Sequence, residues 1–553
     1  MNVFVETLEK LAKNIYREKQ KHREFTGAVP HPREQAEKCW LCFEHFSQSD
    51  EGVLDHCHYT GKFLGWAHNK CNLQRSSLNY TPIFAHNLSN YDLHHVMLAL
   101  QDMDTRNTFS IIPKTDEKYI SLIIGVWIKS YQDKNGLTKN VYEYIRLLDS
   151  YKFMSASLDN LVQNLPKEKL TLMDQHFRKY PAETVDLLKK KGSFPYGYVD
   201  SFAKLEETSL PPLKMWKNSL DQFNVTTTAE EYAHALKVYN KFGCRNIGDY
   251  YKIYLVSDVF LLACTMLSFR EICYETYGLD CCQYFTSSNL SGEAMLKICK
   301  PELKMLTDRA QLDVVENLIR GGISSVFAKR LCRANNKMLP DYDPTKPSTY
   351  IIMIDANNLY GGIMEKFALP LNEFELFDEC LEDADCQEEM LEKLTTLHAD
   401  SPYGFIAEVD LEYPDGLHEL HFDFPLAPEK LKIDKNWLSE YQLRLLEDFG
   451  MSTPPPNRKL VQTLFAKKNY TLHYRTLQLY TDLGMKVTKI HRVLGFRQAK
   501  WLKPYVELNT MKRKAAKNKF DQDFFKLMVN SAFGKTCESK RNRFKVHLVR
   551  NEE

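Results

Sequence analysis

Hydrophobic side chains recur at helix-like and strand-like spacings in separate parts of this chain. Near the N-terminus, apolar residues three or four positions apart, with charges between them, predict an amphipathic helix; they are Phe4, Leu8, Leu11 and Ile15. The segment from Ile83 to Asp92 predicts a buried strand that runs into a turn and a helix. Tyr254 and Asp258 lie in an apolar-periodic segment, and their i, i+4 spacing places both side chains on one helix face.

The second half of the chain contains two further patterned segments. The apolar run from Tyr350 to Ile354 predicts a buried strand that ends at Asp355. A carboxylate at the end of such a strand is well placed to hold a divalent metal against a triphosphate. Farther on, Lys526, Asn530 and Phe533 fall on one face of a predicted helix, at i, i+4 and i+7.

Length and composition indicate a folded chain of several domains. At 553 residues, three or four domains are expected, and 44% hydrophobic with 26% charged residues is ordinary for a soluble protein. The longest apolar run, Val259 to Leu267, is too short to span a membrane, and no signal-peptide pattern is present. The scattered cysteines favour one metal site in an intracellular chain over a disulfide framework.

Charge is unevenly distributed although the net charge is only +1. Residues Lys500 to Arg550 include 14 Lys or Arg against four acidic residues, whereas Glu373 to Glu392 is strongly acidic. Basic charge gathered on one segment is expected where a protein contacts phosphates. The alternative for such a run is a solvated helix face.

Two pairs of potential zinc ligands lie close together near the N-terminus. Cys39 and Cys42, and then His68 and Cys71, are each separated by two residues, a spacing that aims thiolate and imidazole donors at one tetrahedral Zn²⁺. A module this small cannot build its own core, so the metal would supply its folding energy.

The order of residues around this site resembles the His-Me endonucleases related to phage recombination endonuclease VII, with His68 in place of one cysteine. The resemblance implies that Asp55 and Asn72 hold a catalytic magnesium, that His56 is the general base, and that His58 supports the site. The alternative is a zinc knuckle that only stabilises the region or contacts DNA.

The middle of the chain resembles the proofreading domains of family B DNA polymerases. The segment Asn87 to Asp92, then Ser157 with Leu158, then Tyr254 to Asp258 resemble the second exonuclease motif, a single-strand contact motif and the third exonuclease motif. By this resemblance Asp92 and Asp258 are metal ligands, Tyr254 orients water, and Asn87 and Ser157 contact the primer end. No Asp-x-Glu pattern precedes Cys39, so little proofreading activity is expected.

The C-terminal half resembles the polymerase domain of the same family, of the protein-primed kind. Asp355 to Tyr360 is similar to motif A: Asp355 is implied as a catalytic metal ligand and Tyr360 as the residue that excludes a 2′-hydroxyl, with Asn358 in place of the common Ser and Leu359 beside it. Ahead of it, Arg320, Gly321 and Gly322 resemble a template-contacting linker, with paired glycines that permit positive φ and close backbone approach.

Residues Lys526 to Lys535 resemble motif B, with Phe533 in place of Tyr. Lys526 is then expected to neutralise the triphosphate, and the nascent base pair is expected to be lined by Asn530, Phe533 and Gly534. One of the cations Lys512, Arg513 and Lys514 is expected to meet the triphosphate as well. The separation between the two motifs fits the insertion of protein-primed enzymes, in which the basic and aromatic stretch Lys459 to Tyr470 would suit DNA.

The nearest overall resemblance is to the polymerases of Maverick or Polinton transposons and related viruses. It implies a multidomain α/β and α+β fold with a zinc ββα-type nuclease module, a partial RNase H-like exonuclease domain, and a partial palm with helical fingers. The expected boundaries are 1–36 for an N-terminal helix, 37–78 for the zinc module, 79–304 for the exonuclease-like domain, 305–365 for the linker and motif A, 366–500 for the insertion, and 501–553 for the fingers.

The implied cofactors are Mg²⁺ or Mn²⁺ and a structural Zn²⁺, and the implied partners are primer–template DNA, deoxynucleoside triphosphates and a terminal protein primer, with no membrane. The sequence leaves the location open: the nucleus would suit a transposon-derived chain, but no signal for it is recognisable. Only 17 residues follow Thr536, and none fits the carboxylate motif expected after motif B, so the sequence predicts a polymerase that is truncated at both ends and weakly active or inactive. Two alternatives remain open: a nuclease that acts through the zinc module, and a DNA-binding scaffold without catalysis.

Overall fold

The computed structural model divides into two compact units, residues 1–297 with 508–553 and residues 298–507. Each is described by itself. The structure describes residues 2–22, 24–25, 27–47, 52–58, 60–74, 79–100, 103–115, 118–216, 227–324, 332–539, 541 and 546. The end of the basic segment Lys500 to Arg550 therefore lies largely outside the described residues. The mixed α/β architecture expected from the sequence is confirmed.

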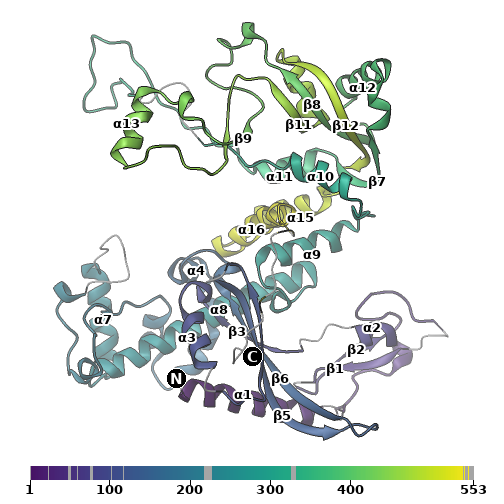
Figure 1. Cartoon of the computed structure of the whole chain (residues 1–553). Coiled ribbons are helices and arrows are strands. Elements are labelled where there is room, and N and C mark those ends of the chain that lie inside the picture. Colours follow the sequence, from purple (N-terminus) through teal and green to yellow (C-terminus); the bar gives the residue numbers. More distant parts are fainter. Residues whose placement is uncertain are drawn as a thin grey trace. The chain divides into compact units, whose positions relative to one another are not determined.

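The first unit is built around a four-stranded sheet of order β3-β6-β5-β4. Strand β3 pairs in parallel with β6, and the other pairs are antiparallel, with β5 and β6 forming the long hairpin in Figure 1. The strands are β3 (Thr81–Ala85), β4 (Thr108–Pro113), β5 (Tyr119–Gln132) and β6 (Thr138–Asp149). A separate antiparallel hairpin, β1 (Val53–His56) with β2 (Phe63–Ala67), is followed directly by α2 (Asn69–Gln74).

Helices supply the rest of the first unit. They are α1 (Asn2–Lys21), α3 (Asp92–Ala99), α4 (Leu158–Asn164), α5 (Thr171–His176), α6 (Ala182–Val185), α7 (Ala229–Lys241), α8 (Ile247–Tyr277), α9 (Ser287–Cys299) and α16 (Lys519–Thr536), with α15 (Lys503–Ala515) extending into it. The core of the sheet is closed by α1 and α3, which bury Leu8 and Leu93 against Leu122, Ile124 and Ile145.

The N-terminal segment forms the expected helix, but its buried face is displaced from the expected one. Leu8 is buried as expected, whereas Phe4 and Leu11 are each 40% exposed. The side chains that accompany Leu8 in the core are Val5 and Ala12. The small Ala12 lets α1 approach the sheet closely, so the face that fits the sheet is selected over the face with the larger side chains.

Helix α8 is the one helix in the described part of the chain that is long and apolar enough to cross a membrane by length and composition, with a mean hydropathy of 1.6 in its most apolar window. Core helices of soluble proteins meet the same criterion. In this structure α8 buries residues along its length, from Ile247 through Leu261 and Phe269 to Tyr277.

The second unit contains an antiparallel sheet of order β11-β8-β12-β7, shown with α12 beside β12 in Figure 1. Its strands are β7 (Leu369–Phe377), β8 (Tyr403–Glu412), β11 (Lys467–His473) and β12 (Lys486–Ala499). A separate two-stranded antiparallel sheet pairs β9 (Glu429–Leu431) with β10 (Lys459–Val461). Its helices are α10 (Arg309–Leu318), α11 (Leu359–Lys366), α12 (Ala384–Thr396), α13 (Glu440–Asp448) and α14 (Tyr474–Asp482).

Both faces of the central strand β8 are covered because its residues alternate. Ala407, Val409 and Leu411 pack in the core that includes Leu394 of α12 and Leu477 of α14. On the opposite face, Ile406 packs with Leu494, Phe496 and Val314 of α10. The same face also carries the acidic residues Glu408 and Asp410, both nearly buried.

One expectation about the second unit is wrong. The run Tyr350–Ile354 is not a strand, and its side chains are 62–94% exposed. A strand needs neighbouring strands to bond its backbone, and none among the described residues pairs with this run.

The stretch Lys459 to Tyr470 is only partly accessible. Lys467 is fully buried and bonded to Glu429, and Tyr470 is 5% exposed, so these two residues serve packing. Lys459 and Lys468 are exposed, and DNA contact by this stretch stays a prediction.

The negative charge of Asp410 on β8 is compensated by a network of hydrogen-bond donors. Asp410 accepts hydrogen bonds from Lys468 Nζ at 2.8 Å, Asn469 N at 2.9 Å and His491 Nε2 at 2.9 Å. Burial would raise the pKa of Asp410, but these donors outweigh it and lower the pKa to about 2. The folded state therefore favours the carboxylate.

The Asp410 network predicts acid sensitivity of the second unit. Because the folded pKa is below the unfolded one, its stabilisation is present above about pH 4 and is lost as the pH falls toward 2, with about 2 kcal/mol at stake. We expect Asp410→Asn to reduce the acid-induced loss of unfolding free energy by about that amount, measured by urea unfolding between pH 5 and 2. Asp415→Asn is the control, because Asp415 is fully exposed. Equal acid sensitivity of wild type and D410N would contradict the role of this network.

Candidate functional site

Four metal-binding side chains converge at the start of the hairpin module. The ligand atoms of Cys39, Cys42, His68 and Cys71 all lie within 4.8 Å of one another. His68 Nδ1 lies 3.3 Å from Cys42 Sγ and 3.9 Å from Cys71 Sγ. The other ring nitrogen, Nε2, donates to the backbone carbonyl of His45 at 3.2 Å, which orients Nδ1 as the ligand atom.

The backbone around Cys39 favours a thiolate. The N–H groups of Leu41 and His68 both donate to Cys39 Sγ at 3.4 Å. Burial would raise the pKa of Cys39, but N–H donors from Cys42, His68 and Leu41 lower it to about 7. Burial and the neighbouring sulfur atoms raise the pKa of Cys71 to about 11. One acidic thiol among three sulfurs and one imidazole is a donor set that fits Zn²⁺.

The predicted nuclease residues lie on the hairpin and the helix that follow. Asp55 is 5% exposed in β1, and His56 ends that strand, with its ring 4.9 Å from the ring of His58. His56 Nε2 donates to the backbone carbonyl of His22 at 3.2 Å, which leaves Nδ1 as the proton-accepting nitrogen. Asn72 is on α2, directly after the last zinc ligand.

The exonuclease-like residues of α8 lie in a polar cluster that sequence reasoning missed in part. Lys191 Nζ donates to Tyr254 OH at 2.6 Å and to Asp258 Oδ2 at 2.5 Å. The hydroxyl of Tyr196 donates to Tyr254 OH at 3.1 Å. No periodicity joins Lys191 to a residue 63 positions later, so only the fold reveals the pair.

One carboxylate oxygen of Asp258 makes no hydrogen bond. Burial raises its pKa, and the Lys191 ammonium opposes that rise. Burial also raises the pKa of Tyr254 far above its ordinary value, so its hydroxyl stays protonated. Asp258 Oδ1 is buried without a hydrogen-bond partner, although the rest of the cluster is bonded. An unpaired carboxylate oxygen of this kind fits a divalent metal ligand.

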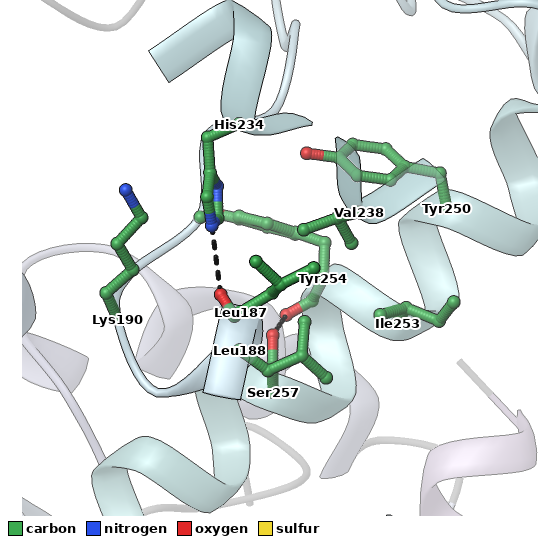
Figure 2. Close-up of a pocket in the computed structure, with 10 residues that line it drawn as sticks. Leu187, Leu188, Lys190, His234, Val238, Tyr250, Ile253, Tyr254 and Ser257 are labelled. Atoms are coloured by element: carbon green, nitrogen blue, oxygen red, sulfur yellow. Dashed lines mark hydrogen bonds between the residues drawn. The ribbon is translucent and has the colours of Figure 1, made fainter. Parts of the chain in front are cut away.

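The pocket behind Tyr254 is a packing feature. Figure 2 shows a mixed lining of apolar residues and of Lys190, His234, Tyr250, Tyr254 and Ser257. Ser257 donates a hydrogen bond to the Tyr254 carbonyl, and His234 donates one to the Leu187 carbonyl. Its volume of about 10 Å³ corresponds to roughly one water molecule, far less than a nucleotide needs. The residues that line the pocket therefore help to hold Tyr254 in position.

The other exonuclease-like residues gather at one edge of the first sheet. Strands β3 and β6 are parallel, with Ala85 opposite Asp149, so the segments after both strands emerge at the same edge. His86 joins these segments: its Nδ1 lies 2.9 Å from Ser150 Oγ and its Nε2 lies 3.0 Å from the carbonyl of Ala156. Sequence reasoning did not single out His86.

Individual residues at this edge have clear local roles. Asn87 has a left-handed backbone (φ 63°) and accepts a hydrogen bond from Asn90 at 2.6 Å. Asp92 is the exposed first residue of α3. Ser157 accepts the Asn160 N–H at 3.3 Å as the N-cap of α4, whose first residue is Leu158.

Helix α16 presents the motif B residues on its exposed side. Lys526, Asn530 and Gly534 are exposed, and Phe533 is half-buried. The opposite side is buried by Phe520, Phe524, Phe525, Met528, Val529, Ser531 and Ala532. Nearby in the chain, Lys512, Arg513 and Lys514 are exposed in the last turn of α15. The structure thus places these polar and basic side chains where a ligand can reach them.

The motif A residues lie in the second unit. Asp355 is exposed at the end of the unpaired run, and Tyr360 is 46% exposed in the first turn of α11, next to Leu359. Asn358 has a left-handed backbone (φ 54°), and its amide lies over Gly361, where a Cβ would be 2.4 Å from Asn358 Nδ2. Because Asp355 and Lys526 belong to different units, their separation is not described.

The glycine pair before motif A differs from expectation. Neither Gly321 nor Gly322 has a positive φ, and a Cβ on either would meet nothing within 4 Å, so no close approach by described residues requires glycine here. Arg320 Nη1 donates to the Thr471 carbonyl at 2.6 Å, and its guanidinium lies 4.0 Å from the centre of the Tyr470 ring. Arg320 therefore anchors this segment to β11.

The sequence model described as DNA polymerase type B, organellar and viral, matches residues 74–553, so the chain belongs to this family.

Solved structures provide a second comparison. A phi29 DNA polymerase structure in an orthorhombic crystal form has 14% identity and a TM-score of 0.42, covering 83% of this chain and 60% of that chain. Phi29 DNA polymerase complexed with primer-template DNA has 14% identity and a TM-score of 0.41, covering 83% and 59%. The chain thus spans about 60% of the length of these polymerases. No curated protein matches it.

The four-ligand cluster predicts that the hairpin module depends on zinc. Zinc binding contributes on the order of 10 kcal/mol to such modules, more than their small cores supply. We expect Cys42→Ser to release one zinc per chain and to abolish amide-exchange protection in β1 and β2, measured by elemental analysis and hydrogen exchange. Cys57→Ser is the matched control, since Cys57 lies in the module but outside the cluster. Unchanged zinc content in C42S would contradict the assignment.

Proposed function

We propose that this chain acts as a DNA-directed DNA polymerase, transferring nucleotides to a primer end. The observation that carries the proposal is helix α16, which directs Lys526 and Asn530 outward while its apolar side is buried. Family membership supports the same function. A fixed cation on an exposed helix face is suited to a triphosphate, whose charge increases at the leaving group during transfer.

The proposed roles of the individual side chains follow the sequence resemblance to motifs A and B. Lys526 would neutralise the triphosphate, and the base pair would be lined by Asn530, Phe533 and Gly534. Asn358, Leu359 and Tyr360 would contact the nucleotide from the motif A side. The cations Lys512, Arg513 and Lys514 would supply further phosphate contacts.

A divalent metal is part of this proposal. The exposed carboxylate of Asp355 is a hard oxygen donor and fits Mg²⁺ or Mn²⁺. When bound, the metal supplies Lewis-acid stabilisation of the phosphate oxygens. In the exonuclease-like cluster, Asp258 and Asp92 would hold metal in the same way, and Lys191 would keep the Asp258 carboxylate ionised.

The proposed partners are primer–template DNA and deoxynucleoside triphosphates. Structures of phi29 DNA polymerase include complexes with primer-template DNA and incoming nucleotide substrates and with single-stranded DNA. In this chain Asn87, Ser157 and Leu158 would contact a single-stranded primer end, and Arg320, Gly321 and Gly322 the template. A terminal protein primer and an origin in a Maverick or Polinton element remain proposals drawn from the sequence resemblance.

Primer extension tests the polymerase proposal. We expect the full chain to extend a primed template, with Lys526→Ala reducing kcat/KM for the nucleotide about 100-fold, because the charge compensation at the triphosphate is lost. Asp355→Ala should abolish extension. Lys519→Ala is the matched control: this lysine lies on the same helix, is 59% exposed and pairs with Asp523.

Two outcomes would contradict this proposal. Absence of extension by the wild-type chain under Mg²⁺ and Mn²⁺ would favour the alternatives. A Lys519→Ala loss as large as that of Lys526→Ala would show that α16 contributes only general positive charge.

A second candidate function is DNA cleavage by the zinc module. The specific observation is His56, whose Nε2 donates to the His22 carbonyl and whose Nδ1 is thereby the acceptor that a general base needs. Asp55 and Asn72 supply oxygen donors that fit Mg²⁺, and His58 lies beside His56. This arrangement supports the endonuclease VII-like reading of the module.

Nicking of supercoiled plasmid tests the nuclease. We expect Mg²⁺-dependent nicking by the full chain that falls at least about 100-fold in His56→Ala, because a general base is lost. His45→Ala is the control, since only the backbone carbonyl of His45 takes part in the zinc cluster. Nicking that survives His56→Ala would sink the assignment and leave the module a structural zinc knuckle.

A further inference from the structure

Three cysteines that belong to none of the sites above gather where α8 ends. Cys273 lies in the last turns of α8, and Cys281 and Cys282 follow in a 3-10 turn that extends from Cys281 to Gln283. Cys273 and Cys281 are fully buried, and Cys282 is 4% exposed.

The sulfur atoms converge with a carboxylate. Sγ of Cys281, Sγ of Cys282 and a carboxylate oxygen of Asp280 all lie within 4.8 Å of one another. The Cys273 and Cys281 thiols are in hydrogen-bond contact, as are those of Cys281 and Cys282. Four tetrahedral ligands around Zn²⁺, at about 2.3 Å from the metal, lie about 3.8 Å apart, so Asp280, Cys281 and Cys282 need only a small contraction to bind one metal. Cys273 lies outside this set of three and contacts Cys281, so it would have to approach further to become the fourth ligand.

The surroundings hold this geometry in place. Asp280 Oδ1 accepts the Cys282 N–H at 3.0 Å and caps the turn. Tyr80, from the start of the first sheet, donates its hydroxyl to the Cys282 carbonyl at 2.8 Å. The cluster is therefore fixed from both its own turn and a distant segment.

A nearby cation compensates the charge that a metal–thiolate site carries. Arg270 binds Asp280 through two hydrogen bonds, Nε to Oδ1 at 2.9 Å and Nη2 to Oδ2 at 2.6 Å. Each carboxylate oxygen has two lone pairs, so one remains for a metal. Arg270 would offset part of the negative charge of three thiolates and one carboxylate around a divalent ion.

The cysteines combine burial with a polar neighbour. A buried cysteine in an apolar core behaves as a small hydrophobic residue. Here, two of the sulfurs also have a carboxylate oxygen within 4.8 Å, that of Asp280, which caps the turn and pairs with Arg270. Sulfur atoms beside a hard oxygen donor are a mixed set that Zn²⁺ accepts.

We propose that Cys273, Cys281, Cys282 and Asp280 form a second metal site, for Zn²⁺ or a similar thiophilic divalent cation. The site ties the end of α8 to the turn that leads into α9. Since Ser287 and Ser291 of α9 bond to α16, the metal stabilises the support of the motif B helix. This inference is independent of whether the chain polymerises DNA.

The test is zinc stoichiometry of the full chain, purified with zinc present and then desalted, measured by elemental analysis together with free-thiol counting. We expect two zinc ions per wild-type chain. One should remain in Cys281→Ser/Cys282→Ser and one in Cys39→Ser/Cys42→Ser. Cys264→Ser is the matched control: Cys264 is also buried on α8 but outside the cluster, and this variant should keep both ions.

Cadmium titration keeps the test valid if the double variant folds poorly. Thiolate-to-cadmium absorption of the Cys39→Ser/Cys42→Ser protein should rise to one equivalent, with three thiols protected from alkylation. A single zinc in the wild type that disappears with Cys39→Ser/Cys42→Ser would overturn the proposal. So would a disulfide among Cys273, Cys281 and Cys282 in the purified protein, or a Cys39→Ser/Cys42→Ser chain that takes up no cadmium.

Discussion

The burial of one side of α16 is the constraint on which the presentation of the motif B residues depends. Phe524 packs edge-on against Phe269 of α8, with ring centres 5.1 Å apart. On the α9 side, Ser531 donates to Ser287 at 3.0 Å, and Ser291 donates to the Met528 carbonyl at 2.5 Å. Short serine contacts bring the helices close and fix their rotation, because a rotated α16 would leave these groups unpaired.

The packing of α16 also connects the C-terminal part of the first unit, residues 508–553, with its N-terminal part, residues 1–297. The ring of Phe269 also contacts Phe153 at 6.0 Å between centres, and Phe153 contacts Phe84 of β3 at 5.9 Å. Aromatic contacts thus run without a break from α16 to the strand that precedes Asn87. The C-terminal helix is packed on the exonuclease-like core, which explains why residues 508–553 cluster with residues 1–297.

Spacing within one element predicted local geometry well, because helical periodicity is a property of a few consecutive residues. Helical spacing alone predicted that Lys526 and Asn530 share one face of a helix. It also predicted that Tyr254 and Asp258 lie side by side. The ion pair of Lys191 with Asp258 and the His86 bridge were not, because they join segments that only the fold brings together. Lys467 shows the limit of composition: a lysine beside aromatic residues suits DNA, yet this one is buried on Glu429.

The failed strand at Tyr350 has a different physical cause. A helix forms its backbone hydrogen bonds within itself, so a helical spacing of apolar residues is enough to predict it. A strand forms its backbone hydrogen bonds with neighbouring strands, which its own residues do not specify. The run is apolar, but strand pairing is not encoded in the run itself. Its side chains are exposed, and no strand among the described residues pairs with it.

Helix α8 connects these observations because it is long and continuous. Its 31 residues extend over about 45 Å, with Tyr254 and Asp258 in the first half and Phe269 and Cys273 in the second. An α-helix transmits displacement along its axis with little loss, since each turn is hydrogen-bonded to the next. The turn Cys281–Gln283, the Phe269 contact with α16 and the Tyr254–Asp258 pair therefore all lie on or next to the same helix. If the turn Cys281–Gln283 became less ordered, Phe269 on the last turns of α8 would be displaced first. The displacement would then disturb the packing of Phe269 against Phe524, and with it the buried side of α16 that leaves Lys526 exposed.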